Sequence, residues 1–182
     1  WGPTAAQKGY EGRKDLGNIL PGDGPLFRGY GPMQVTGRAN TTEFHNWCLA
    51  EFGQQVPDFV KSPHLINTDP WEGISAVWYW HTRDLNYYAD RNNLEAITRK
   101  INGGINGLPD RFSYYTRCAL VLLGFGPTQV KEFQAYAGFT GKDVDGIAGE
   151  QTRSALHKHL SKLEDFTFSP ETPTGSTSQV DL

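Results

Sequence analysis

The sequence predicts a mainly α-helical protein, in which a helical core with long ordered loops is followed by a small helical module. Three observations carry this prediction. Apolar residues recur at spacings of three and four along most of the chain after residue 38. No segment shows a convincing strand alternation, and glycine and proline concentrate in the first 38 residues.

Length and composition limit the class of protein. A chain of 182 residues suits one ordinary domain with a small appendage. The longest apolar run, residues 119–123, is far shorter than the ~20 residues of a membrane span. The net charge of −3 shows no basic excess of the kind that marks nucleic-acid binders. We therefore expect no membrane and no nucleic-acid partner. We also expect a monomer.

Residues 1–38 predict ordered loops, because their glycines interrupt any long element. Asn40 and Glu43 then predict an N-cap box that opens a helix. Gly53 would end this helix. One face of it would carry Phe44, Trp47, Cys48 and Phe52.

Three further helices are predicted from start and stop signals. Asp69-Pro70 followed by Glu72 opens the first. Its apolar stripe would be Ile74, Val77, Trp78 and His81. Asn93 caps the second, which ends at residues 103–104. Pro109 opens the third, which Gly124 closes and whose apolar positions would be Phe112, Tyr115, Ala119 and Leu122.

Residues 126–128 mark a boundary. Two short apolar stripes follow, at residues 130–137 and 152–160, and a turn-rich segment separates them. From Ser169 the composition shifts to Ser, Thr, Pro and Gly, which is typical of a flexible tail or linker. We therefore expect a core at residues 1–124, a module at residues 125–161 and a tail at residues 162–182.

The two cysteines, Cys48 and Cys118, could form at most one disulfide. Both lie in predicted helix interiors, so we expect buried free thiols rather than a bridge.

The stretch from Gly22 to Asn40 is the most informative part of the sequence. A phosphate-binding loop is disfavoured, because no strand precedes the glycines and no Lys-Ser/Thr pair ends them. Gln34 and Thr36 alternate with two apolar residues in a predicted extended segment, which places two neutral polar groups on one side. Such groups suit a neutral sugar or a water molecule; satisfying the backbone of the loop is an equal alternative.

Residues 27–40 resemble the signature of family 19 glycoside hydrolases, the chitinases and related lysozymes of phages and bacteria. The resemblance extends over about residues 1–124 and includes segments 10–24, 69–70, 75–80, 101–104 and 110–115. Tyr30 stands where the family commonly has Arg. The resemblance implies a lysozyme-like helical core that acts at the bacterial cell wall.

The resemblance also implies a substrate site. Gln34, Thr36 and Asn40 match positions that line the cleft and help to place the attacking water. Asn102 matches a substrate-contacting asparagine and Arg111 an arginine near the catalytic carboxylates.

Both of the last two residues also have a purely structural interpretation. Asn102 could cap a helix before Gly103, and this role is compatible with substrate contact. Arg111 could be a first-turn surface residue paired with Asp110.

Family 19 enzymes invert the configuration at the anomeric carbon and use one carboxyl group as general acid and another as general base. The resemblance places the general acid in a His-Glu stretch before a Trp-Gly-Pro-Thr segment. That segment stands at residues 1–4 here, and none of the five histidines precedes a glutamate. We therefore expect the general acid upstream of residue 1, and an N-terminally truncated chain that is nearly inert alone.

The position of the general base is less defined. In many lysozyme-type members of the family the base also precedes the Trp-Gly pair, which would place both carboxylates upstream of residue 1. Glu11 is the only acid in this sequence that could be the base by position, while the favoured alternative makes it a partner of Arg13 or Arg28.

Residues 130–134 and 144–156 resemble a peptidoglycan-binding domain, whose hallmark is Phe/Leu-Gln followed by Asp-Gly-Ile-x-Gly-x-x-Thr-x-x-Ala. Asp145-Gly146 lacks the other oxygen ligands of a calcium loop, so we expect no metal and no cofactor. About 35 residues make a marginal core, so the module should lean on the catalytic domain or be a shortened version.

Two hypotheses follow. The first is an enzyme that hydrolyses β-1,4 bonds between N-acetylated sugars, with peptidoglycan preferred over chitin. The second is a non-catalytic cell-wall or chitin-binding protein that has lost the acid. A helical adaptor is disfavoured because it would make the four polar positions Gln34, Thr36, Asn40 and Asn102 coincidental.

Overall fold

The computed structural model describes residues 4–163, so the predicted tail at residues 162–182 lies almost entirely outside it. The mainly α-helical class is confirmed. Within the described residues the only β-type pairing is an isolated bridge between Tyr30 and Val35. None of the helices in this part of the chain is both long and apolar enough to cross a membrane.

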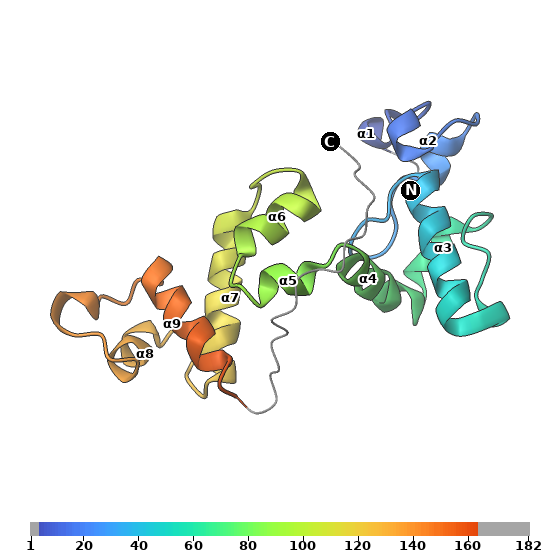
Figure 1. Cartoon of the computed structure of the whole chain (residues 1–182). Coiled ribbons are helices and arrows are strands. Elements are labelled where there is room, and N and C mark those ends of the chain that lie inside the picture. Colours follow the sequence, from blue (N-terminus) through green and yellow to red (C-terminus); the bar gives the residue numbers. More distant parts are fainter. Residues whose placement is uncertain (1–3, 164–182) are drawn as a thin grey trace. The chain divides into compact units, whose positions relative to one another are not determined.

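The chain divides into two compact units between Arg83 and Asp84, and each is described by itself. The domain division expected after residue 124 is inferred from sequence resemblance and not from packing, and it stays a prediction. The first unit contains α1 (Ala5–Lys8), η1 (Lys14–Leu16), α2 (Asp23–Leu26), α3 (Arg38–Phe52), η2 (Gly53–Gln55), η3 (Pro63–Asn67) and α4 (Trp71–Thr82) (Figure 1). The loops expected before residue 38 thus contain three short helical turns.

Helix α3 begins at Arg38, with Gly37 as its N-cap, so the predicted Asn40–Glu43 capping box is wrong. Gly37 has a φ of 92°, and a Cβ there would lie 2.6 Å from the carbonyl oxygen of Leu16. Only glycine fits this close approach, and it therefore sets the start of the helix two residues before the predicted box. Gly53 ends the helix as predicted.

The core of the first unit is aromatic. The ring of Phe44 stacks on Phe59 at 5.1 Å and lies 5.4 Å from Trp78, between ring centroids. The buried cluster consists of Tyr30, Val35, Phe44, Cys48, Val56, Phe59, Ile66 and Trp78. The stripe predicted for α4 is half wrong, because this helix buries Ser75 and Trp78 and leaves Val77 and His81 exposed.

The second unit contains α5 (Leu85–Ala89), α6 (Leu94–Asn102), α7 (Leu108–Leu122), α8 (Val130–Tyr136), η4 (Gly141–Asp143) and α9 (Glu150–Leu160). The cap predicted for α6 is confirmed, since Asn93 Oδ1 accepts a hydrogen bond from the N–H of Ala96 at 2.9 Å. Gly103 follows α6 in the left-handed conformation that ends many helices.

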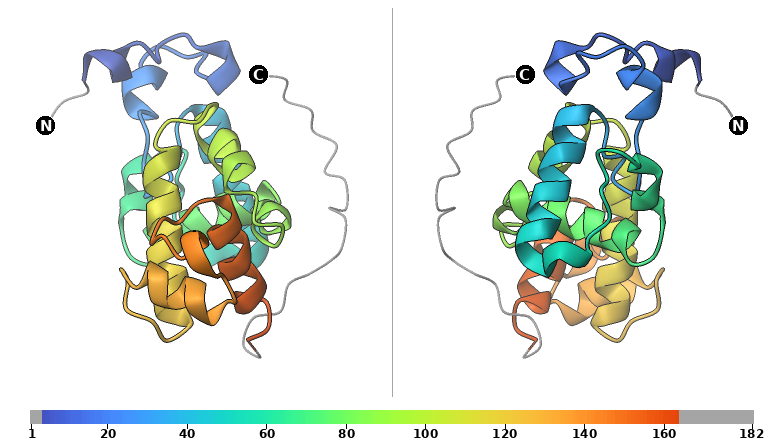
Figure 2. Two further views of the ribbon diagram at one scale, coloured as in Figure 1. Left: turned by 90° about the vertical axis from the view of Figure 1, so that its left-hand side faces the viewer. Right: turned by 90° about the vertical axis from the view of Figure 1, so that its right-hand side faces the viewer.

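Helix α9 lies beside α7 (Figures 1 and 2), and both helices share one hydrophobic core with α8. Ala119 and Leu120 of α7 are buried together with Phe133 of α8 and Leu156 and Leu160 of α9. The expected support of residues 125–161 by the preceding segment is therefore present within this unit.

Both cysteines are free thiols, and only one of them is buried as predicted. Burial raises the pKa of the Cys48 thiol to about 12, which keeps it protonated and unreactive. Cys118 is exposed, because α7 turns Thr116, Ala119 and Leu120 inward and position 118 falls on the opposite side.

Candidate functional site

The polar residues Gln34 and Thr36 belong to a tight turn rather than to the extended segment that the sequence predicts. Tyr30 and Val35 exchange both backbone hydrogen bonds, at 3.2 and 2.7 Å, and so close the turn. Gln34 has a φ of 54°, a conformation unusual for a residue other than glycine. Its side-chain amide donates to the carbonyl of Gly31 at 3.0 Å, which stabilises this strained position.

The turn brings the side chains of Gln34 and Thr36 to the same place. A Cβ at Gly29 would lie 2.9 Å from Thr36 Oγ1 and 3.0 Å from Gln34 Oε1, so both oxygens crowd the same α-carbon. Thr36 Oγ1 also donates to the carbonyl of Gln34 at 2.8 Å. Two neutral oxygen groups therefore converge on one patch of backbone.

Asn40 joins this patch through the start of α3. Its Nδ2 donates to the carbonyl of Thr36 at 2.8 Å, and its Oδ1 accepts from Arg83 at 3.4 Å. The guanidinium of Arg83 lies 4.2 Å above the ring of Tyr79 and 4.8 Å from that of Trp78. Both ends of the Asn40 amide are thus held by the protein, and the structure brings together Gln34, Thr36 and Asn40.

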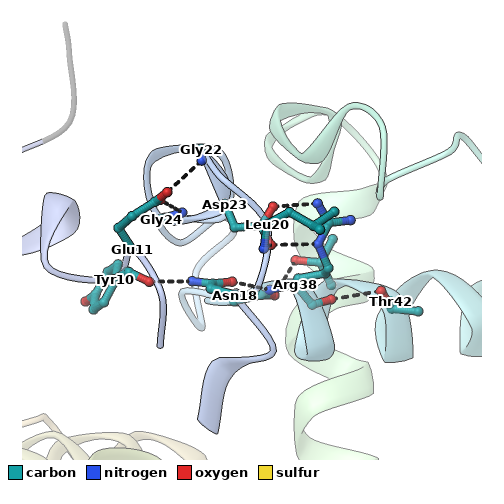
Figure 3. Close-up of polar contacts among 11 residues, drawn as sticks. Tyr10, Glu11, Asn18, Leu20, Gly22, Asp23, Gly24, Arg38 and Thr42 are labelled. Carbon is teal, nitrogen blue, oxygen red and sulfur yellow. Dashed lines mark hydrogen bonds and ion pairs between the residues drawn. The ribbon is translucent and has the colours of Figure 1, made fainter. Parts of the chain in front are cut away.

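Glu11 forms no hydrogen bond or ion pair with either arginine that the sequence suggested as its partner. Its carboxylate accepts the backbone N–H of Gly22 at 2.7 Å and that of Gly24 at 2.8 Å (Figure 3). Arg13 pairs instead with Asp15, and Arg28 donates to the carbonyl of Pro25. The favoured alternative for Glu11 is therefore wrong in its partner, and the observed role is to brace the loop at residues 22–24.

A buried ion pair that the sequence did not predict lies beside this loop. Asp23 is 1% exposed and receives two hydrogen bonds from Arg38, at 2.9 and 2.5 Å (Figure 3). The N–H of Leu20 adds a third bond at 3.0 Å. The hydrogen bond from Arg38 lowers the pKa of Asp23, so this carboxyl group stays charged.

Asn18 completes the same network. Its side chain is fully buried, donates to the carbonyl of Tyr10 at 2.9 Å and accepts the N–H of Arg38 at 2.9 Å. The first residue of α3 is therefore fixed through both its backbone and its side chain. The sequence pattern that could have indicated the buried pair is Asp23 between two glycines, in a segment that is otherwise typical of a loop.

The remaining predicted site residues, Asn102 and Arg111, lie in the second unit. Asn102 is the last residue of α6, is exposed, and donates from Nδ2 to the carbonyl of Asn106 at 2.9 Å. Its side chain braces the turn before α7, while Gly103 forms the cap. Arg111 lies in the first turn of α7 and is half-buried, without an ion pair to Asp110 among the residues described.

None of the carboxyl groups with a resolved pKa shift has the raised pKa of a general acid. The pKa is lowered in each case, chiefly because a hydrogen-bond donor favours the charged form. These groups are Asp15, Asp23, Asp58 and Asp145. Within residues 4–163, no three or more His, Cys, Asp or Glu side chains converge as metal ligands would.

The hallmark residues of the C-terminal module form a buried network of their own. Gln134 is 1% exposed and donates to Asp145 Oδ1 at 2.9 Å and to Thr152 Oγ1 at 3.1 Å. Its side-chain oxygen Oε1 accepts a hydrogen bond from the N–H of Gly146 at 2.8 Å. The signature thus holds the loop before α9 in shape, and it leaves Ile147 67% exposed.

Comparison with known proteins shows a similarity to a curated protein of a known glycoside hydrolase family. Over 111 residues the chain is 34% identical to a glycosyl hydrolase family 19 domain-containing protein from Haemophilus influenzae. The aligned region covers 60% of this chain and 50% of the relative, so the chain spans about half the length of this curated relative. No family model and no solved structure matches the chain. The similarity supports glycoside hydrolase family 19, and it does not bear on the C-terminal module or on truncation.

Proposed function

We propose that this chain is part of an enzyme that hydrolyses β-1,4 glycosidic bonds between the N-acetylated sugars of bacterial peptidoglycan. The observation that carries the proposal is the convergence of Gln34 and Thr36 on Gly29, with Asn40 linked to them. The similarity to a family 19 domain-containing protein supports the class of bond. Chitin is the second polymer with the same chemistry, and we rank it below peptidoglycan because of the resemblance of residues 130–156 to a peptidoglycan-binding domain.

The neutral polar groups suit the placing of a water molecule and of a neutral sugar. An inverting enzyme also needs an acid and a base, with carboxyl groups about 6.5–9.5 Å apart. The lowered pKa values of Asp15, Asp23 and Asp58 disfavour them as the acid. We therefore place the general acid outside the described residues, as the family resemblance implies.

The test uses the protein at its full natural length with purified peptidoglycan and with chitin, and identifies the products by mass spectrometry. We expect peptidoglycan fragments with newly formed reducing ends. Asn40→Ala and Gln34→Ala should each lower kcat by about 100-fold, as the loss of one positioned polar group does in other active sites. Residues 1–182 alone should be nearly inert.

Gln55→Ala is the matched control, because Gln55 is an exposed amide of the same unit outside the turn. Its kcat should equal that of the unmodified protein. Full activity of both Asn40→Ala and Gln34→Ala would contradict the assignment of the site.

Glu11 can be assigned by one substitution. If Glu11 is also the base, Glu11→Gln should lower kcat by at least about 100-fold, in addition to any effect of losing its hydrogen bonds to Gly22 and Gly24. If it only braces Gly22 and Gly24, the same substitution should lower the melting temperature and leave kcat within a few-fold. The two measurements on one variant separate the roles.

Wall anchoring by residues 125–161 is part of the proposal. Tyr136 is 65% exposed and Ile147 67% exposed, although both are large apolar residues. Co-sedimentation with insoluble peptidoglycan should retain less of a Tyr136→Ala/Ile147→Ala variant. An equal retained fraction would remove these two side chains from the proposal.

A non-catalytic cell-wall binder is the alternative. The lowered pKa of each carboxyl group with a resolved shift is the observation that favours it. Co-sedimentation of the full-length protein with peptidoglycan, without release of any fragment, would establish the binder and reject the enzyme.

A further inference from the structure

A groove of about 530 Å³ lies in the second unit, between the α5–α6 turn, α7 and α9. This volume falls in the range of small-molecule sites. The charged side chains that line the groove are Arg91, Glu95, Glu150, Arg153 and the titratable His157. We call it the α7–α9 groove. None of the site residues proposed above lines it.

Arg153 is held in one orientation at this groove. One of its N–H groups donates to the carbonyl of Ala148 at 2.5 Å, and the guanidinium carbon lies 3.9 Å from the ring centroid of Phe112. The other guanidinium donors make no hydrogen bond within the described residues. A guanidinium that is already fixed loses little entropy on binding, and its planar fork matches a carboxylate.

The other wall is fixed in a similar way. Arg91 lies 3.7 Å over the ring of Tyr87 and donates to the Tyr87 carbonyl at 2.9 Å. His157 Nε2 lies 3.0 Å from the carbonyl oxygen of Asp90, which ties α9 to the α5–α6 turn. Two oriented guanidinium groups therefore belong to walls that are linked to each other.

Tyr115 also lines the groove, and its hydroxyl is buried without a hydrogen-bond partner among the described residues. Burial raises the pKa of this phenol to about 12, so it remains an O–H donor at neutral pH. Folded proteins rarely leave such a donor unpaired. An acceptor group of a bound molecule would supply the missing partner.

The groove also carries negative charge. Glu95 and Glu150 are exposed at its edge, and Glu95 pairs with Arg99 at 2.8 Å. These carboxylates would repel a polyanion, whereas they can accept hydrogen bonds from an ammonium group. The lining therefore fits a molecule that carries carboxylate and amino groups together, as a short peptide does, better than it fits a neutral glycan.

We propose that the α7–α9 groove binds the peptide stem of the wall polymer, with a stem carboxylate on Arg153. The choice of this peptide rests on the proposed function, since a wall polysaccharide that bears peptides is the polymer in question. The groove would then select peptidoglycan over chitin, which has the same type of glycosidic bond and no peptide.

The test measures binding by titration calorimetry on the full-length protein, with three probes. These are a synthetic stem tetrapeptide, the same peptide with its carboxyl groups amidated, and a chitin tetrasaccharide. We expect the free-acid peptide to bind at least about tenfold more tightly than the amidated peptide, because the bond to Arg153 is charge-assisted. Arg153→Gln should remove that difference.

Lys158→Gln is the matched control, since it removes one positive charge from the exposed side of the same helix. It should leave the affinity unchanged. Because Arg153 also anchors Ala148, the folding of Arg153→Gln is checked by circular dichroism. Ser154→Trp, which adds a large side chain at another residue that lines the groove and leaves both arginines in the sequence, replaces it if folding is lost.

The outcomes separate this proposal from the proposed function. Equal affinity for the two peptides, or unchanged peptide affinity in Ser154→Trp, overturns the groove assignment even if the protein hydrolyses peptidoglycan. Peptide binding that depends on Arg153, in a protein that releases no wall fragments, supports the groove and rejects the enzyme.

Discussion

At the scale of single residues, Asp23 links three parts of the first unit. Its carboxylate holds the N–H of Leu20 and the guanidinium of Arg38, and Arg38 is the first residue of α3. The guanidinium carbon of Arg38 also lies 4.7 Å from the ring centroid of Phe27. The pair therefore connects the loop to the helix whose first turn carries Asn40. We expect its loss to lower the stability of the protein more than it changes catalysis.

Asp23→Asn should lower the free energy of unfolding by about 2–3 kcal/mol, because it leaves the Arg38 charge partly buried and unpaired. Urea denaturation measures this. Asp15→Asn is the control, since both members of its pair with Arg13 are exposed to solvent and we expect little change in stability. Equal effects of the two substitutions would contradict a special role for Asp23.

The same pair sets a dependence of stability on pH. The pKa of Asp23 is lowered in the folded protein, so its contribution is complete above the unfolded pKa of about 3.9 and is lost as pH falls through the folded value. The unmodified protein should therefore lose stability below about pH 4 more steeply than Asp23→Asn does. Parallel acid unfolding curves would show that the pair does not contribute.

Gly29 is the second residue whose substitution we expect to have a specific effect. Gly29→Ala places a Cβ 2.9 Å from Thr36 Oγ1 and 3.0 Å from Gln34 Oε1, so both side chains must move. We expect kcat of the proposed hydrolysis to fall by at least about tenfold. Gly12→Ala is the control, because Gly12 also has a positive φ and no atom lies near its Cβ position. It should cost about 1 kcal/mol of stability and leave kcat unchanged.

At the scale of elements, the sequence predicted helices well where a cap or a stop had a local signal. Asn93 at the start of α6 and Gly53 at the end of α3 are such cases. It failed at Gly37, because the reason for that helix start is a close approach to Leu16, a residue 21 positions earlier in the sequence. A contact between distant segments leaves no local pattern.

The candidate site shows the same limit. The resemblance of residues 27–40 identified the polar residues, and the structure brings three of them together in the first unit. Their arrangement could not be predicted, because it depends on the left-handed backbone of Gln34 and on the bridge between Tyr30 and Val35. An alternating pattern of polar and apolar residues is typical of a strand and gives no sign of such a turn.

The shape of the loop before α9 should depend on Gln134. Gln134→Ala removes the acceptor of the Gly146 N–H and a donor to Asp145, and it should cost about 2–3 kcal/mol because buried polar groups lose their partners. Hydrogen exchange should accelerate at Gly146 above all. Gln151→Ala, at an exposed position on α9, should change stability by less than about 0.5 kcal/mol. Unchanged exchange at Gly146 would contradict the bracing role of Gln134.

At the scale of the whole molecule, each unit has its own hydrophobic cluster. Phe44 and Trp78 lie in the cluster of the first unit. Leu120 of α7 and Leu156 of α9 lie in that of the second. The sequence analysis predicts a domain boundary near residue 124, yet α7 and α9 on either side of that position bury their apolar faces together. Residues 125–161 should therefore not unfold independently of α7.

Leu156→Ala tests this arrangement. It opens a cavity in the shared core and should cost about 2–5 kcal/mol. Native-state hydrogen exchange should then accelerate in α7, α8 and α9 together, because sub-global opening follows shared cores. Phe44→Ala, in the first unit, should accelerate exchange in α3 by a comparable factor. If Leu156→Ala accelerated exchange only after residue 124 and left α7 protected, the module would be an independent folding unit, and the shared core would not determine its stability.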